Sequence, residues 1–256
     1  MSVSASDFSH LKADYDRDGF AIVRGLLPPE QFEELRSNLD RYIAEIVPTL
    51  PDSDAFFVDK ARPETLKQMQ HMGGDAYFRE YVKHPIWNAV AEALNGEPSS
   101  SETPEWFNKP AGTDSPTPPH QDNYYFCLEP PHVLTMWMAL DRVDEENGCL
   151  RYVRGSHLEG VRPHGRSAVL GFSQGILDYG PDDEAREVPI CLEPGDVAVH
   201  HGNMIHRADP NRTADRSRRS FAMVFRGESV RRDEEAYARY MDGLRQQHQE
   251  MGLATT

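Results

Sequence analysis

The sequence predicts a mainly β fold with helices packed on its outside. Between residues 132 and 225, short apolar runs alternate with turn residues, which is typical of antiparallel strands. Two amphipathic stretches precede these runs and one follows them, and each has the spacing of a helix face. We expect a single domain over residues 1–256, with a helical N-terminal part to about 100, a β core over about 101–226 and a C-terminal helix over 233–250.

The N-terminal part begins with a strand and continues with a helix. Alternating apolar residues from Phe20 predict the strand, which Gly25 and two prolines end. A helix is expected from these prolines to Pro48, because apolar residues recur at steps of three and four. They are Phe32, Leu35, Leu39, Ile43 and Ile46.

A second helix and a long loop are expected next. Pro85 is typical of a first helical position, and Gly96 is typical of a helix end. The segment Pro98–Pro119 is rich in Ser, Thr, Pro and Gly, which favours a loop, and Trp106 and Lys109 within it indicate a functional one.

Five strands and a last helix are expected after residue 120. The apolar runs are 132–140, 149–153, 188–192, 196–200 and 219–225, and turn pairs such as Asn147-Gly148 separate them. Asp233 is a helix cap, and Tyr237, Tyr240 and Leu244 share one face of the helix that follows.

Charge and composition exclude several classes of partner. The chain has 27 Lys and Arg against 42 Asp and Glu, a formal charge of −15, which disfavours nucleic acid and anionic membranes. Three cysteines without CxxC spacing indicate a reducing compartment. No long apolar run or signal peptide is visible, so we expect a cytoplasmic protein that acts on a small molecule, with no nucleic acid or membrane partner.

Three residues have the composition of a metal site. His120 and Asp122 are two residues apart, so on a strand they would share a face. His206 follows an apolar run 86 residues later. Two histidines and one carboxylate, with three positions left open, form the facial triad of non-haem Fe(II) oxygenases.

An ordered set of motifs gives a family resemblance. The His120-x-Asp122 motif is followed by Asn147-Gly148-Cys149-Leu150 with Gly155-Ser156-His157, then Gly195-Asp196, His206, Asn211 and Arg218. This order resembles the phytanoyl-CoA dioxygenase family of Fe(II)/2-oxoglutarate-dependent oxygenases. Segments 66–70 and 108–110 also look like family segments, so the resemblance covers about residues 18–225.

The resemblance implies a fold and a chemistry. The fold would be a double-stranded β-helix, a cupin-like jelly roll. The metal would be Fe(II), held by His120, Asp122 and His206 as catalytic residues, with 2-oxoglutarate as cosubstrate and O2 as oxidant. The expected reaction is hydroxylation of a small, polar metabolite with release of succinate and CO2.

A buried carboxylate of 2-oxoglutarate requires a cationic partner. On a regular strand Arg218 shares a face with small residues, whereas Arg219 shares one with Phe221 and larger side chains, so Arg218 is preferred and Arg219 is the alternative. Ser220 completes an RxS arrangement that such oxygenases use. By resemblance, Lys67 is a second contact and Trp137 lines the cosubstrate pocket.

The chain departs from the family at two points near the site. Arg207-Ala208 stands where members commonly have Gly-Ser, so one hydroxyl is absent, and the interval from Asn211 to Arg218 is one residue longer than the common form. His200 and His201 are expected to be structural or supporting residues. Tyr125 or Asn123 are candidates for the substrate side, as are Arg166, Phe172 and Gln174.

Three alternatives compete with the hydroxylase. Halogenation is disfavoured because Asp122 occupies the position that halide would need. A zinc hydrolase would leave the cosubstrate arginine unexplained. A non-catalytic cupin-like protein that binds metal or a small molecule is the main alternative from another class, and an intact triad together with Arg218 argues against it.

Overall fold

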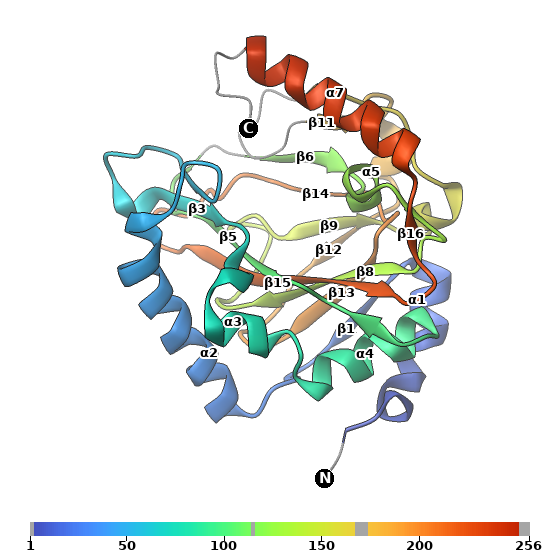
Figure 1. The fold of residues 1–256 in the computed structure, drawn as a ribbon, viewed down its shortest axis with the longest axis horizontal. Helices are drawn as coiled ribbons and strands as arrows, with labels where there is room; N and C mark the ends of the chain where they lie inside the picture. Colours follow the sequence, from blue (N-terminus) through green and yellow to red (C-terminus); the bar gives the residue numbers. More distant parts are fainter. Residues whose placement is uncertain (1–2, 114–115, 167–173, 251–256) are drawn as a thin grey trace.

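The computed structural model describes residues 3–113, 116–166 and 174–250. Two antiparallel sheets lie face to face, and helices cover the outer face of the larger sheet (Figure 1). This is the mainly β architecture with flanking helices that the sequence predicts. In the part of the chain that is described, no helix is both long and apolar enough to cross a membrane.

The larger sheet forms one wall of the interior. Among the described residues its path is β1-β13-β8-β15-β5-β3-β2, and the short β4 also pairs with β15. These strands are β1 (Phe20–Val23), β2 (Ala55–Phe57), β3 (Leu66–Met69), β4 (Ser99–Ser100), β5 (Pro104–Lys109), β8 (Val133–Ala139), β13 (Val197–His201) and β15 (Arg218–Gly227). The N-terminal part is therefore not only helical, because β1, β2 and β3 join the sheet.

The smaller sheet forms the opposite wall. Its order is β12-β9-β14-β6, with β12 (Glu187–Ile190), β9 (Leu150–Val153), β14 (His206–Ala208) and β6 (Thr117–His120). Two separate two-stranded sheets are also present, β10 (His164–Arg166) with β11 (Gln174–Ile176) and β7 (Leu128–Glu129) with β16 (Arg231–Arg232). All five strands expected after residue 120 are present, with ends shifted by one or two residues.

The expectation of a loop over Pro98–Pro119 is wrong for its central part. β5 occupies Pro104–Lys109 and lies between β15 and β3 in the larger sheet. Its flanks are rich in turn residues, and its proline stands at the first strand position, where the missing backbone donor is tolerated. This strand brings Lys109 into the interior of the protein.

The helices are α1 (Lys12–Asp18), α2 (Pro29–Arg41), α3 (Ala76–Tyr81), α4 (Pro85–Asn95), α5 (Asp122–Phe126), α6 (Pro181–Glu184) and α7 (Glu234–Glu250). The three that the sequence predicts, α2, α4 and α7, begin within one residue of their expected positions, and the sequence did not predict the other four. After α2 the chain continues as a π-helical turn, Tyr42–Ile46, and a 3₁₀ turn, Val47–Thr49, so the apolar stripe extends past the α-helix itself. Further 3₁₀ turns are Ala5–Leu11, Pro63–Thr65, Met72–Gly74 and Ser156–Glu159.

Two hydrophobic clusters lie on either side of the larger sheet. β8 is buried along its whole length because both of its faces are covered. Met136 and Met138 pack in the cluster that includes α2 and α4, whereas Trp137 and Ala139 belong to the cluster between the two sheets. The alternation of a strand therefore directs every second residue of β8 into the interior.

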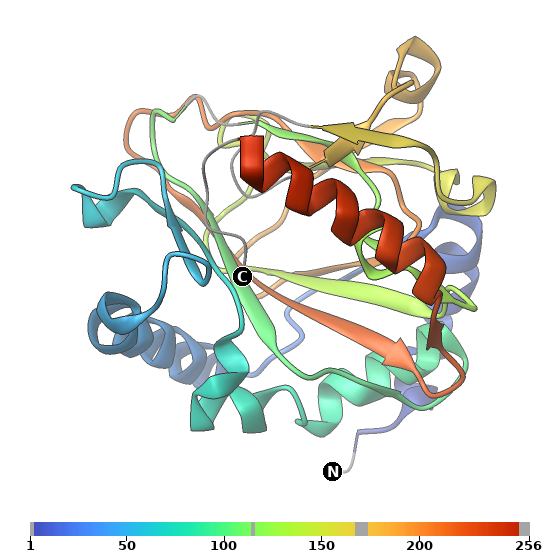
Figure 2. The same cartoon turned by 45° about the horizontal axis from the view of Figure 1, so that its top comes forward.

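The C-terminal helix lies over one end of the two sheets (Figure 2). Asp233 caps α7, since its Oδ1 accepts hydrogen bonds from the backbone N–H groups of Glu235 and Ala236, both at 3.0 Å. Tyr240 of α7 lines the interior cavity and lies 5.7 Å, ring centre to ring centre, from Tyr125. The helix thus contributes to the cavity wall.

Gly148 offers a test of the turn that follows β8. Its φ is +82°, and a Cβ atom there would lie 2.4 Å from the backbone oxygen of Asp209. We expect Gly148→Ala to lower the free energy of unfolding by about 2 kcal/mol or more, measured by chemical denaturation, because left-handed strain and a backbone clash add. Gly180→Ala is the control, since a Cβ at Gly180 meets nothing within 4 Å. Equal effects of the two variants would contradict this account.

Candidate active site

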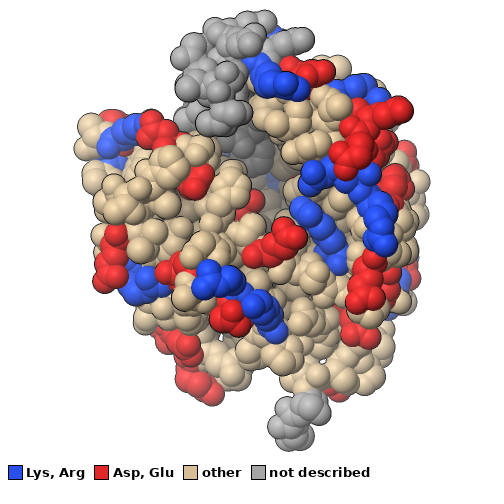
Figure 3. Space-filling model, viewed as in Figure 1, with Lys and Arg blue, Asp and Glu red and all other residues tan. Residues whose placement is uncertain are grey.

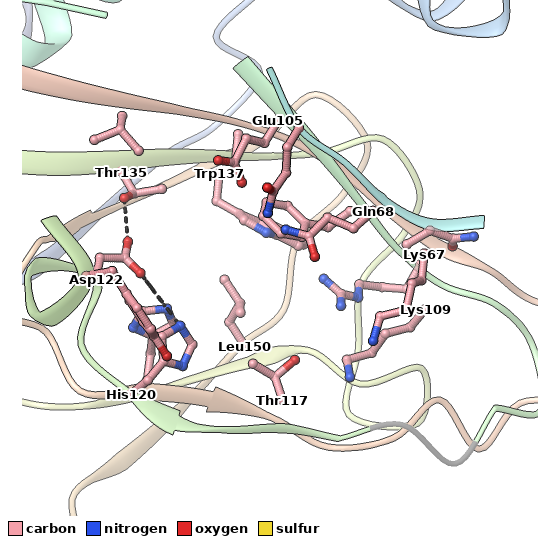
Figure 4. Close-up of a pocket in the computed structure, with 18 of the residues that line it drawn as sticks. Lys67, Gln68, Glu105, Lys109, Thr117, His120, Asp122, Thr135, Trp137 and Leu150 are labelled. Atoms are coloured by element: carbon pink, nitrogen blue, oxygen red, sulfur yellow. Dashed lines mark hydrogen bonds and ion pairs between the residues drawn. The ribbon is translucent and has the colours of Figure 1, made fainter. Parts of the chain in front are cut away.

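A cavity of about 290 Å³ opens between the two sheets. Side chains from both sheets line it, together with Asp122 and Tyr125 of α5 and Tyr240 of α7. Figure 4 shows the labelled side chains pointing into this space, with Asp122 and His120 at one end and Lys67 and Lys109 at the other.

The three expected metal ligands meet at one end of the cavity. His120 ends β6 and His206 begins β14, and the two are direct partners in the antiparallel register. The Nε2 atoms of both histidines lie 3.6 Å from Oδ1 of Asp122. The expectation that Asp122 shares a strand face with His120 is wrong, because α5 begins at Asp122, yet the carboxylate still reaches the same point.

Hydrogen bonds orient both imidazoles for metal binding. Nδ1 of His120 lies 2.8 Å from the carbonyl oxygen of Pro118, and Nδ1 of His206 lies 3.0 Å from that of Met204. These contacts assign the proton to Nδ1, so Nε2 keeps its lone pair. Burial lowers the pKa of both histidines, for His206 well below its usual range, which favours the neutral form that a ligand needs.

Asp122 is held by two groups of the larger sheet. Its Oδ2 accepts a hydrogen bond from Oγ1 of Thr135 at 2.6 Å (Figure 4) and another from Nε2 of His200 at 3.1 Å. His200 is oriented in turn by Tyr152, whose hydroxyl lies 2.8 Å from Nδ1. Burial acts to raise the pKa of Asp122, but His206, His200 and His120 outweigh it and hold the pKa below its usual range. Oδ1 therefore remains charged and faces the two Nε2 atoms.

His200 and Thr135 support Asp122, and they are far apart in the sequence but adjacent in the fold. They are direct partners in the register of β13 and β8, so both reach Asp122 from one place on the sheet. His200 has a supporting role of the kind expected from the sequence. His201 faces the other way, and its ring lies 6.2 Å from Tyr15.

Three basic side chains converge on the other end of the cavity. Arg218 and Lys109 are partners in the register of β15 and β5, and Lys67 lies on the adjacent β3. Burial lowers the pKa of Arg218 to about 10. Burial and the charges of Arg218 and Lys67 lower the pKa of Lys109 to about 6. Such mutual repulsion in a buried place is relieved by an anion.

Arg218 is the better placed of the two candidate arginines. It is 4 % exposed, its guanidinium lies 5.1 Å from the ring centre of Trp137, and its Nε has no hydrogen-bond partner among the described residues. Arg219 points to the opposite face, where it forms an ion pair of 2.7 Å with Asp141. An unsatisfied guanidinium donor beside a cavity fits a carboxylate ligand.

The remaining candidates divide into cavity and scaffold residues. Lys67 and Trp137 line the cavity, whereas Ser220 is fully buried and its hydroxyl lies 3.5 Å from the carbonyl oxygen of Phe107. Ser220 is thus not brought to the cavity surface, and its cosubstrate role stays a prediction.

Of the substrate-side candidates, Tyr125 lines the cavity and donates its hydroxyl to the backbone oxygen of Gln174, at 2.5 Å. Asn123 is a scaffold residue that donates to Asn203. Phe172 lies outside the described residues, and Arg166 belongs to β10.

Arg207 and Ala208, which replace the Gly-Ser common in the family, have structural roles. Ala208 is buried between the sheets, and Arg207 forms ion pairs with Glu187 and Asp209 outside the cavity. The longer interval that follows is organised by Asn211, whose side-chain amide donates to the backbone oxygens of Lys109 and Arg216 at 2.8 and 2.6 Å.

Comparison with known proteins identifies relatives over most of the chain. The family model of phytanoyl-CoA dioxygenase matches residues 15–220. A probable phytanoyl-CoA dioxygenase of Caenorhabditis elegans is 27 % identical over 78 % of this chain and 69 % of its own length. The peroxisomal phytanoyl-CoA dioxygenase of Mus musculus is 25 % identical over 78 % of this chain and 62 % of its own, so the chain spans less than two thirds of that relative.

Solved structures share the fold. The epimerase SnoN from nogalamycin biosynthesis, in complex with Fe3+, alpha ketoglutarate and nogalamycin RO, has a TM-score of 0.70 and 26 % identity, over 88 % of this chain and 85 % of that one. The alpha ketoglutarate-dependent carbocyclase SnoK has a TM-score of 0.70 at 22 % identity, over 90 % and 88 %. The expected jelly-roll fold is confirmed by these likenesses.

The support of Asp122 can be tested by metal binding. We expect Thr135→Val to weaken binding of Fe(II), or of Co(II) as a spectroscopic probe, by about 10-fold, because Oδ2 loses one of its two donors and the carboxylate can rotate. Thr117→Val is the matched control, since Thr117 lines the cavity and no dashed line joins it to Asp122 or His120 in Figure 4. An unchanged affinity in Thr135→Val would show that Thr135 does not orient the carboxylate.

Proposed function

The chain belongs to the phytanoyl-CoA dioxygenase family of Fe(II)/2-oxoglutarate-dependent oxygenases, and on that premise we propose that it hydroxylates a small, polar metabolite with release of succinate and CO2. The observation that carries the proposal is one cavity with a buried His-Asp-His triad at one end and Arg218 at the other. The two features match the two parts of the expected cofactor set, a metal and a dicarboxylate.

We propose His120, Asp122 and His206 as the iron ligands. Two neutral imidazoles and one carboxylate suit Fe(II), and their ligand atoms lie within 4.8 Å of one another. When bound, iron with 2-oxoglutarate supplies the O2-dependent oxidation. The protein's own contribution is to fix the three ligand atoms, which the bonds to Asp122 and to both Nδ1 atoms support.

Arg218 is the proposed partner of the distal carboxylate of 2-oxoglutarate. A planar guanidinium donates two parallel hydrogen bonds to a carboxylate, and the orphaned Nε of Arg218 is available for one of them. Trp137 packs against the guanidinium and limits its movement. Lys67 and Lys109 line the same end of the cavity, and a bound carboxylate would favour the protonated form of Lys109.

The size and charge of the protein favour a small metabolite over a long nucleotide conjugate. The cavity of about 290 Å³ must hold both cosubstrate and substrate. Acidic and basic side chains both lie on the face shown in Figure 3, and the basic group right of centre has acidic side chains above and below it, which disfavours a ligand with several phosphates. The relatives' name refers to an acyl-CoA, and this chain carries a net charge of −15.

Similarity to one solved structure favours epimerisation as a second candidate reaction. The epimerase SnoN is 26 % identical to this chain, so inversion of a carbon centre is the second candidate reaction. The two reactions differ in the mass of the product, because hydroxylation adds one oxygen atom and epimerisation adds none. Both require the same triad and the same cosubstrate site.

Anaerobic addition of Fe(II) and 2-oxoglutarate tests the cofactor assignment. We expect the visible metal-to-ligand charge-transfer band in the wild type and its loss in Asp122→Ala. Arg218→Ala should weaken 2-oxoglutarate binding by about 30-fold or more, because a buried carboxylate loses its charged partner. Arg219→Ala is the matched control and should keep the band, since Arg219 pairs with Asp141 outside the cavity.

The opposite results have distinct meanings. A protein that binds Fe(II) and shows no band would overturn the cosubstrate assignment and favour a cupin-like binding protein. A band that weakens in Arg219→Ala and persists in Arg218→Ala would exchange their roles. If the band is observed, succinate release is measured across a panel of metabolites to find a substrate. The mass of the product then separates hydroxylation from epimerisation.

A further inference from the structure

A carboxylate on the larger sheet faces the cavity and takes no part in the chemistry described so far. Glu105 lies on β5 opposite Ala222 of β15, which in turn lies opposite Trp137 of β8. Directly paired residues share a face of a sheet, so Glu105 points into the interior as Trp137 does. In Figure 4, Glu105 and Gln68, from neighbouring strands, extend into the same part of the cavity.

The charge of Glu105 is not compensated by the protein. Among the described residues it forms no ion pair, and the charges that act on it are the carboxylate of Asp122 and the ring of His71. Burial, with the repulsion of Asp122, raises the pKa of Glu105 to about 7. A carboxyl group in such a place is stabilised by a donor that the cavity receives from outside.

Gln68 adds a second acceptor beside Glu105. Its side chain is 3 % exposed, and its Oε1 has no hydrogen-bond partner among the described residues. Within the described ranges, its side chain is also the group that hydrogen-bonds the carboxyl of Glu105. One corner of the cavity therefore holds a buried carbonyl oxygen with no donor among the described residues, beside a carboxyl group whose hydrogen-bonding neighbour is the side chain of Gln68.

The cations of the cavity lie elsewhere. The pair Arg218 and Lys109 is four residues along the strands from the pair Ala222 and Glu105, which corresponds to about 13 Å of extended chain. The pKa of Lys109 responds to Arg218 and Lys67, and Glu105 is not among the groups that shift it. The anion-binding corner and the corner of Glu105 are thus separate.

We propose that Glu105, with Gln68, binds a cationic nitrogen of the substrate, so that the substrate class is a small amine or zwitterion. An ammonium group supplies several donors and a charge that favours the ionised carboxylate, whereas a neutral hydroxyl supplies one donor and no charge. Glu105 lies two strands, about 10 Å, from the strand of Thr135, so the remainder of a small molecule bound there extends toward Asp122. This assignment deepens the proposed function and rests on it.

Competition between matched compounds tests the assignment. The probes are small primary amines, each paired with the alcohol of the same carbon skeleton, and equilibrium dialysis measures their retention by the protein loaded with Fe(II) and 2-oxoglutarate under anaerobic conditions. We expect the wild type to retain amines over alcohols and Glu105→Gln to lose that preference by about 10-fold or more. Glu102→Gln, at an exposed position of the same segment, should behave as the wild type.

The charge-transfer band of the same samples separates this inference from the proposed function. Glu105→Gln should keep the band, because Glu105 is not one of the three residues that could hold a metal ion, and Gln68→Leu should keep it while retaining amines less well. A wild-type protein without the band would contradict the proposed function, and the dialysis would still report on Glu105. Equal retention of amines and alcohols by the wild type, or of amines by the wild type and Glu105→Gln, would overturn the inference.

Discussion

The pairing of His120 with His206 across β6 and β14 is the constraint on which the site depends. Two imidazoles that face each other at 4.1 Å between ring centres leave one place where a third ligand can join them. Asp122 reaches that place only because the chain turns into α5 directly after β6, and Thr135 and His200 of the larger sheet hold it there. The triad therefore requires the correct separation of both sheets, and the scaffold is as much a part of the site as the ligands.

Burial of charge explains why the cavity suits ligands. Arg218 and Lys109 share one corner at a cost in desolvation and repulsion, and Glu105 and Asp122 carry the opposite excess nearby. In an isolated fold such groups destabilise the native state, and a ligand of opposite charge recovers that free energy on binding. Functional sites commonly contain such buried charged groups, which a core built for stability alone would avoid. Here basic groups lie in one corner and acidic groups in another, so the cavity orients a ligand that carries both charges.

The sequence predicted the elements with strong periodicity and the residues with a motif. The strands after residue 120, the helix that ends at Gly96 and the capped helix α7 follow from patterns that neighbouring residues alone produce. β5 was missed because its local composition resembles a loop and its stability comes from the strands on either side. His200, Thr135 and Glu105 lack any motif, and their roles arise from cross-strand register, which joins residues far apart in the chain. By contrast, the alternation of side chains along a strand is enough to predict that Arg219 lies outside the cavity.

The two sheets divide the work of the site. The smaller sheet presents both histidines, whereas the larger sheet presents Arg218, Lys109, Glu105 and Gln68 on one continuous inner face. A change of side chain on β5 or β3 alters the charge that meets a ligand without displacing β6 or β14, because the two sets of strands do not share hydrogen bonds. The metal geometry can therefore stay fixed while recognition varies, and a substrate is specified by residues that no metal-site motif contains.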